Sequence, residues 1–416
     1  MDYGYATCLA CTRPAGSLGC DPSKYPEVFV LQYRHMGDTG IDVSAIGIGT
    51  MRFKDRDNAV DIINRSLDSG LTYIDIGPAY SFKSFDDNAE AWTGEAIRGR
   101  ERSSMVISSK AQPRPKSDNP NVAASLGVFT RDQMWQCIEN SLKRAGIGYF
   151  DFYQFWDMSA PDHFEAACLG DDAPLKALLE AKEQGLIREL GFTSHGQADD
   201  IISWLAQVPE FRTITVYYNF NDRHPERAVN YAHEHGVGVV VMGPLRGGLL
   251  VGQSPVFARY LPELEGAPVQ EIALRFLLST PAVSTVIGGI NDPVHLAENV
   301  AVVEAETALT PEQRQKFVDA FQEFSKGEAL CSGCNYCAGA CPEELPISTL
   351  LGVFQLHDVL EMPGALAQLK NFATNDQFDA SKCLACGICV EKCPQSLDIP
   401  GKMEAVAAFF AKLKSA

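Results

Sequence analysis

Eight cysteines in the last 86 residues are the side chains of this 416-residue chain best suited to chemistry. They form two copies of one pattern, C-x2-C-x2-C-x3-C-P-x-x-L-x-I, which begin at Cys331 and Cys383 and lie 52 residues apart. A cubane iron–sulfur cluster needs four converging thiolates, and three cysteines on one tight loop supply three of them. The pattern therefore predicts two 4Fe-4S clusters. Two zinc sites are the alternative, because C-x2-C also binds zinc, but zinc does not explain a duplicated eight-cysteine pattern ending in Cys-Pro.

Both motifs resemble those of two-cluster ferredoxins at every position, and in that family the cysteine before the proline ligates the other cluster. The spacing of apolar residues over 347–362 and 364–373 predicts helices, so the resemblance is closest to the helical ferredoxins of respiratory iron–sulfur subunits. It implies two ligand sets: Cys331, Cys334 and Cys337 with Cys393, and Cys383, Cys386 and Cys389 with Cys341.

Three further cysteines near the start of the chain, Cys8, Cys11 and Cys20, carry a weaker signal. Because no fourth thiolate is evident, we expect these cysteines to belong to an ordinary N-terminal extension, residues 1–27. A third metal site is the alternative.

The composition favours a globular protein with a large core, since 46% of the residues are hydrophobic and 21% are charged. A net charge of −18 argues against nucleic acid as a partner, because phosphate binding depends on clustered Lys and Arg. We find no apolar run of the roughly 18 residues that a membrane helix needs, and the first residues have no signal-peptide pattern. We therefore expect a cytoplasmic protein without a membrane partner, whose thirteen cysteines serve metal or redox chemistry rather than disulfides.

The strands and helices that would position further active-site residues lie before the cysteine motifs. There, short apolar runs rich in β-branched residues alternate with helical stretches such as 57–70 and 267–280. Continuous apolar strands indicate a parallel sheet covered by helices, and eight of them predict a (β/α)8 TIM barrel in the α/β class. In such barrels the active site lies at the C-terminal ends of the strands. The predicted strands span 44–50, 72–77, 104–110, 149–155, 188–194, 213–219, 237–244 and 284–289.

At those strand ends the chain resembles the aldo-keto reductase family over about 280 residues, in the segments YIDIGPAY, ISSKAQP and MGPLRGG and in an opening hairpin, YRHMGDTGIDVS. The resemblance makes Tyr80 the proton donor, Lys110 the cation that lowers the donor's pKa, and Asp75 the carboxylate paired with that lysine. The assignment is physically sensible, because an unperturbed tyrosine is a weak acid at neutral pH. A structural ion pair with a loop aromatic is the alternative.

Trp156 stands where this family usually has a catalytic histidine, after the YQ of the fourth predicted strand. An indole donates one hydrogen bond but is neither acid nor base. Trp156 is therefore expected either to bind a substrate oxygen or stack on a flat substrate, or only to pack. His195 is a candidate to compensate.

The nucleotide site is also implied by the resemblance. The glutamine expected on the sixth strand is missing from this chain, and Thr215 stands nearest to its place. The loop after the eighth strand supplies Asp292 and no Lys or Arg to hold a 2′-phosphate, so we favour NADH over NADPH. The implied nucleotide residues are Thr193, Ser194 and Asn219 at the nicotinamide amide; Pro244, Leu245, Arg246 and Gly248 at the pyrophosphate; Gly288 after the eighth strand; and Glu298 and Asn299 at the adenine.

Together these features predict an iron–sulfur oxidoreductase with a barrel over residues 28–325 and a helical ferredoxin-like domain over 326–416. Its expected reaction is reduction of a carbonyl, or of an activated C=C or C–O bond, in a small organic substrate. Hydride transfer moves two electrons and a 4Fe-4S cluster passes one, so two alternatives stay open. One is a cluster-driven one-electron reductase without nicotinamide. The other is an electron-transfer subunit with a silent barrel. We also expect a redox partner protein, such as a ferredoxin or flavoprotein, and anaerobic conditions.

Overall fold

The computed structural model describes residues 31–111, 130–258, 262–303, 308–327, 330–331, 337, 339–393 and 396–415. Cys8, Cys11, Cys20 and Cys334 lie outside the described residues, as does the predicted extension 1–27. The chain divides into two compact units. The first comprises residues 1–218, 223–244 and 280–308, and the second comprises 219–222, 245–279 and 309–416. The predicted domain boundaries at 27/28 and 325/326 stay a prediction.

The first unit contains a closed barrel of eight parallel strands, which confirms the predicted (β/α)8 fold. Strand β10 pairs with β3, so the last strand in the sequence closes the barrel against the first. Every predicted strand overlaps an observed one. The strands are β3 Ile46–Gly49, β4 Tyr73–Asp75, β5 Val106–Ala111, β6 Phe150–Phe155, β7 Ile187–Ser194, β8 Phe211–Tyr217, β9 Gly238–Met242 and β10 Thr285–Gly288.

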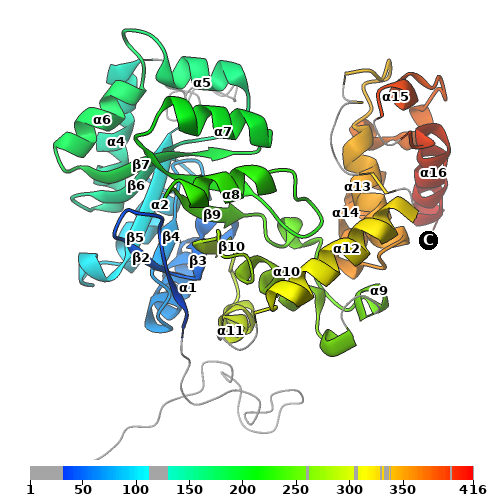
Figure 1. Ribbon diagram of the computed structural model, residues 1–416, viewed down its shortest axis with the longest axis horizontal. Helices are drawn as coiled ribbons and strands as arrows, with labels where there is room; N and C mark the ends of the chain where they lie inside the picture. Colours follow the sequence, from blue (N-terminus) through cyan, green and yellow to red (C-terminus); the bar gives the residue numbers. More distant parts are fainter. Residues whose placement is uncertain are drawn as a thin grey trace, which may run out of the picture. The chain divides into compact units, whose positions relative to one another are not determined.

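Helices of the first unit lie outside the strands, as Figure 1 shows for α4, α6 and α7. Local sequence fixes their ends: in α4, Thr130 and Gln133 form a capping box, and Gly146 ends the helix in the left-handed conformation. The helices are α1 Arg56–Asp68, α2 Ala89–Ala96, α4 Arg131–Ala145, α5 Pro161–Cys168, α6 Leu175–Glu183, α7 Ala198–Gln207, α8 Glu226–Glu234 and α11 Pro293–Val302.

The antiparallel hairpin of β1 Tyr33–His35 and β2 Asp42–Ser44 closes the N-terminal end of the barrel. Met36, Ile41 and Val43 from this hairpin are buried in one cluster with core residues of the strands. These strand residues are Tyr73, Val106, Phe152, Val240 and Ile287. Because one end is filled with apolar side chains, the C-terminal end is left for chemistry.

The second unit is helical, with α10 Val269–Leu278, α12 Pro311–Gly327, α13 Ile347–Asp358, α14 Pro363–Ala373, α15 Ile388–Glu391 and α16 Ile399–Ser415. The helix predicted over 347–362 ends early, and Glu361 beyond it adopts a left-handed φ of 52°. Phe220 packs edge-on against Phe276, Phe317 and Phe321, which joins α10 and α12 in one aromatic core. Among the described residues no helix has the length and apolar character needed to cross a membrane.

Candidate active site and candidate metal centre

Asp75, Tyr80 and Lys110 meet at the C-terminal end of the barrel. Asp75 is the last residue of β4, Lys110 lies near the end of the neighbouring β5, and Tyr80 follows in the loop after β4. Lys110 Nζ donates to both Asp75 carboxylate oxygens, at 2.6 and 2.7 Å, and to the Tyr80 hydroxyl at 3.3 Å. Asp75 and Lys110 are each 1% exposed and Tyr80 is 8% exposed. The three side chains therefore form one buried, connected polar group.

Burial dominates the electrostatics of this group. It raises the pKa of Tyr80 above its ordinary value, Lys110 opposes the rise, and Asp75 adds to it. Lys110 thus acts in the expected direction, but burial outweighs it. The pKa of Lys110 is also raised, because the attraction of Asp75 and Tyr80 for the ammonium exceeds the cost of burying it. Tyr80 is therefore protonated and Lys110 charged at neutral pH, as a proton donor and its cation must be.

Trp156 comes directly after β6, and its ring lies edge-on to Tyr80 at 5.2 Å between centroids and 80° between planes. Its backbone N–H donates to Ala111 O, which ties it to the end of β5. The next residue, Asp157, has a left-handed φ of 61°, and its N–H donates to Thr193 Oγ1 at 2.8 Å. The backbone of Trp156 and Asp157 is thus tied to both neighbouring strands, β5 and β7, and the indole lies beside Tyr80.

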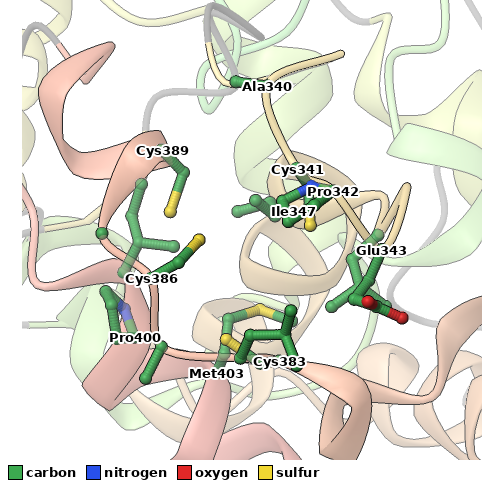
Figure 2. A pocket seen from close by; sticks show the side chains of 15 residues that line it. Ala340, Cys341, Pro342, Glu343, Ile347, Cys383, Cys386, Cys389, Pro400 and Met403 are labelled. Atoms are coloured by element: carbon green, nitrogen blue, oxygen red, sulfur yellow. The ribbon is translucent and has the colours of Figure 1, made fainter.

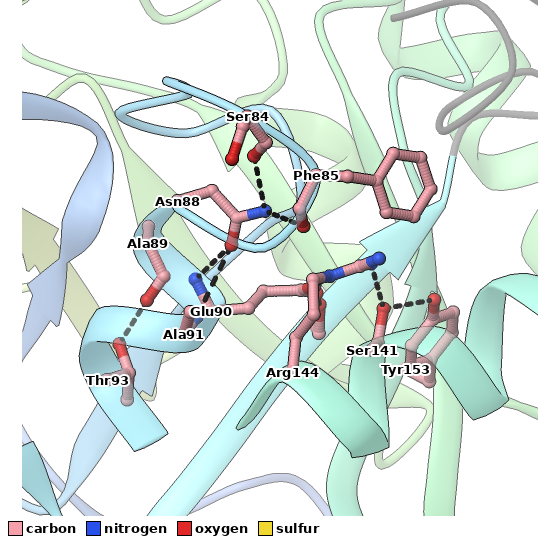
Figure 3. Close-up of polar contacts among 11 residues, drawn as sticks. Ser84, Phe85, Asn88, Ala89, Glu90, Ala91, Thr93, Ser141, Arg144 and Tyr153 are labelled. Carbon is pink, nitrogen blue, oxygen red and sulfur yellow. Dashed lines mark hydrogen bonds and ion pairs between the residues drawn. The ribbon is translucent and has the colours of Figure 1, made fainter. Parts of the chain in front are cut away.

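A buried ion pair between Glu90 and Arg144, outside the barrel, supports the segments that carry Tyr80 and Lys110 (Figure 3). Glu90 on α2 accepts a hydrogen bond from Ser109 Oγ at 2.6 Å and one from Arg144 Nε at 2.6 Å. Ser109 precedes Lys110 on β5, and the N–H of Ala89, next to Glu90, donates to Tyr80 O. Glu90 is fully buried, so it fixes the start of α2, and with it the Tyr80 loop, against the lysine strand.

Sequence reasoning missed a polar chain inside the barrel, centred on Gln154 of β6. Its Nε2 donates to Ser108 Oγ at 2.7 Å, and its Oε1 accepts from Thr215 Oγ1 at 2.9 Å. Thr215 stands nearest to the missing glutamine of β8 and here completes this chain. The available signal was a polar residue in a mostly apolar strand, whose other polar residue is Asp151.

The predicted nucleotide residues fall in both units. In the first unit, the hydroxyls of Thr193 and Ser194 accept backbone hydrogen bonds from Asp157 and Gly196, which leaves each O–H as a donor. In the second unit, Asn219 Oδ1 accepts from two backbone amides of its own turn. The other predicted residues divide between the units as Pro244, Gly288, Glu298 and Asn299 in the first and Leu245, Arg246 and Gly248 in the second.

Arg52 is a second residue that the sequence did not single out. It follows β3, and its Cγ lies 2.9 Å from where a side chain on Gly289 would begin. Asn291 in the same loop after β10 donates to Arg52 O at 3.0 Å. Barrel closure therefore brings the side chain of Arg52 against this loop, which itself contains no Lys or Arg.

Cys341, Cys383, Cys386 and Cys389 line one pocket of the second unit (Figure 2). Cys341 belongs to the first motif and the other three to the second, so the structure brings together the set that the ferredoxin resemblance implies. Apolar side chains complete the lining: Leu345, Ile347, Ile399, Met403 and Pro400.

Within the described ranges, no three His, Cys, Asp or Glu side chains are grouped so that they could hold a metal ion. Burial and the neighbouring Cys383, Cys386 and Cys341 raise the pKa of Cys389.

The other ligand set is described only in part. Cys331, Cys337 and Cys393 are described, whereas Cys334 is not. Gln355 of α13 accepts from Cys331 N at 2.7 Å and donates to Cys331 O at 2.8 Å.

Comparison with known proteins gives two family matches: "Aldo/keto reductase family" over residues 45–320 and "4Fe-4S dicluster domain" over 330–397. The oxidoreductase YqkF of Bacillus subtilis is 25% identical over 71% of this chain and 97% of its own, and L-galactose dehydrogenase of Arabidopsis thaliana is 24% identical over 73% and 98%. The holo structure of an aldo-keto reductase from Bacillus halodurans is 26% identical, with a TM-score of 0.60 over 70% of this chain and 96% of that one.

Proposed function

This chain belongs to the aldo/keto reductase family and carries a 4Fe-4S dicluster domain, and from that premise we propose that Tyr80 is the proton donor in the reduction of a small organic substrate. The substrate class is a carbonyl compound, or one with an activated C=C or C–O bond. The observation that carries the proposal is the contact of Lys110 with both Asp75 and the Tyr80 hydroxyl.

In carbonyl reduction, Tyr80 transfers its hydroxyl proton to the substrate oxygen as a hydride reaches the carbonyl carbon. The C=O π bond breaks, a C–H and an O–H bond form, and Tyr80 is left as a phenolate. Lys110 stabilises that phenolate from 3.3 Å, and Asp75 keeps Lys110 charged and oriented. A bound reduced nicotinamide supplies the hydride.

We propose that Trp156 takes over the orienting role of the absent histidine. Its ring is fixed beside Tyr80, and its N–H is a single hydrogen-bond donor that suits a substrate oxygen. Tyr80 then stays the sole proton donor.

We propose that the pocket of Figure 2 is one cluster site, held by Cys341, Cys383, Cys386 and Cys389. The other cluster would be held by Cys331, Cys334, Cys337 and Cys393. A 4Fe-4S cluster supplies one electron at a time. This leaves a second candidate function, one-electron reduction driven through the clusters without nicotinamide.

One surface observation favours that candidate. Leu384 is 63% exposed and Ile388 is 42% exposed, and they flank Cys386, which is itself exposed. An apolar rim around an accessible cluster ligand suits transient docking of a redox protein such as a ferredoxin or flavoprotein.

The nucleotide preference rests on fewer contacts. We propose NADH as the cofactor, because the loop after β10 itself contains no Lys or Arg. The side chain of Arg52 lies beside Gly289 in that loop, so Arg52 is the residue at which binding of a 2′-phosphate is to be tested.

The experiment compares two reductants on anaerobically purified protein, with a panel of aromatic aldehydes and ketones as substrates. In one arm NADH is the donor, and in the other a low-potential donor, dithionite-reduced methyl viologen, is used. Turnover with NADH that persists after the clusters are removed supports hydride chemistry. Turnover only with the low-potential donor, lost with the clusters, supports the second candidate. No turnover with either donor contradicts both.

A further inference from the structure

Helix α13 contacts Cys331 through one buried side chain. Gln355 is 8% exposed, and its amide pairs with the Cys331 backbone in both directions, at 2.7 Å to N and 2.8 Å to O. A side-chain amide that satisfies both backbone groups of one residue fixes its position and orientation. Cys331 opens the first cysteine motif, so Gln355 sets where that motif begins.

Among the described residues, no side chain makes such a contact with the backbone of Cys383, which opens the second motif. The residue 52 positions after Gln355, which the internal repeat would make its counterpart, is Ala407. Cys383 instead donates its N–H to Ala380 O, in the turn just before it. Although the two motifs match in sequence, the described contacts of Cys331 include a buried side chain of a distant helix and those of Cys383 do not.

The same helix also holds the loop after β9. Arg246 Nη1 donates to Gly352 O at 3.2 Å, and a Cβ on Gly352 would lie 2.8 Å from Arg246 Nη2. Gly352 and Gln355 are three residues apart, so they lie on one side of α13.

Close packing continues beyond Arg246. The buried Ser254 Oγ donates to Leu360 O at 2.6 Å, and Gly364 approaches Gly248 O so closely that a Cβ would not fit. The loop 245–254 is therefore built against α13 and the start of α14, within the second unit.

We propose that α13 is the common support of the first cluster and of loop 245–254, with Gln355 as the positioning residue for Cys331 and Arg246 as the positioning residue for the loop. The inference rests on the proposed function, which gives Cys331 its ligand role and the loop its nucleotide role. It assigns Arg246 to α13 rather than to the pyrophosphate directly.

The test uses three variants of the full-length protein, purified anaerobically with both clusters. Gln355→Glu keeps the shape but replaces the amide donor that faces Cys331 O by an oxygen. Gly352→Ala displaces the Arg246 guanidinium and breaks its hydrogen bond to Gly352 O, which loosens the loop without changing any loop residue. Thr349→Ala, at an exposed position of the same helix, is the matched control.

Two quantities are measured, the rate at which a chelator removes iron from each cluster, resolved by EPR, and the Kd for NADH. Loss of the amide donor to the part-buried Cys331 carbonyl predicts that Gln355→Glu loses the first cluster at least about fivefold faster, with the second unchanged within about twofold. Loss of one charge-assisted hydrogen bond predicts that Gly352→Ala raises the Kd for NADH about three- to tenfold with both clusters intact.

Equal loss of both clusters, or no change in either, overturns the role of Gln355. An unchanged Kd in Gly352→Ala overturns the role of Arg246. If the unaltered protein binds no NADH, the nicotinamide part of the proposed function fails together with the Arg246 role. The Gln355 result stands apart from that outcome, because it is read from the clusters alone.

Discussion

Replacing Lys110 with Met is expected to destabilise the barrel strongly, because it leaves the Asp75 carboxylate buried without its partner. Both side chains are at most 2% exposed, and the ammonium lies 2.6 and 2.7 Å from the two carboxylate oxygens. Removing one partner of such a pair costs about 3–5 kcal/mol in the free energy of unfolding. Asp75→Asn should cost a similar amount, since it leaves a buried ammonium.

The double variant Asp75→Asn/Lys110→Met removes both charges, so it should be less destabilised than the sum of the singles by about 3 kcal/mol. Urea unfolding at pH 8 followed by tryptophan fluorescence measures this, since all four tryptophans lie in the first unit: Trp92, Trp135, Trp156 and Trp204. The pKa of Lys110 is raised above its ordinary 10.5, so the lysine's contribution is present below that pH and is lost as the pH rises through the folded-state pKa. Burial raises the pKa of Asp75 above its ordinary 3.8 although Lys110 opposes the rise, so the ion pair is also lost at acid pH, when Asp75 is protonated. Additive single effects, or a cost below about 1 kcal/mol for Lys110→Met, would refute the reasoning.

Four further outcomes are expected. Because burial raises the pKa of Tyr80 from 10.0, turnover should stay constant as the pH rises and fall only above about 10; a fall centred near pH 8 contradicts this. Cys341→Ser should remove the EPR signal of the cluster assigned to the second motif, and Cys393→Ser the other; loss of the cluster nearest in sequence contradicts the crossed ligand sets. Chemical analysis of anaerobic protein should give about eight irons and eight sulfides per chain, and bound zinc without sulfide contradicts it. Arg52→Met should raise the Kd for NADPH more than that for NADH, which equal effects would contradict.

The barrel could be predicted because its strands are short and continuously apolar, a pattern that a parallel sheet covered by helices requires. The positions of Asp75 and Lys110 followed from the rule that parallel strands end at one face. The burial of Tyr80 did not follow. The sequence suggested the nearby cation Lys110, which lowers the pKa of Tyr80. It did not suggest the desolvation of Tyr80, which raises that pKa by more than Lys110 lowers it.

Contacts between distant segments were also beyond the sequence. Arg52 reaches the loop after β10 only because the barrel closes β10 against β3, and no local pattern marks that meeting. Gln355 reads as one polar residue in an apolar helix until the fold places it against Cys331. The ferredoxin-like repeat could be predicted because its cysteines keep a fixed spacing. The residue that contacts Cys331, Gln355, has no counterpart at the repeat position, which is Ala407.

The most direct test of the central claim is the turnover of Tyr80→Phe under anaerobic conditions, with whichever reductant supports the unaltered protein. This change removes one hydroxyl, keeps the ring that packs against Trp156, and leaves the Asp75–Lys110 pair in place. We expect turnover to fall by about 10²- to 10⁴-fold, the range of a lost general acid, while iron content and urea stability match the unaltered protein. Turnover within about twofold of the unaltered protein, with both clusters present, would contradict the claim that Tyr80 is the proton donor.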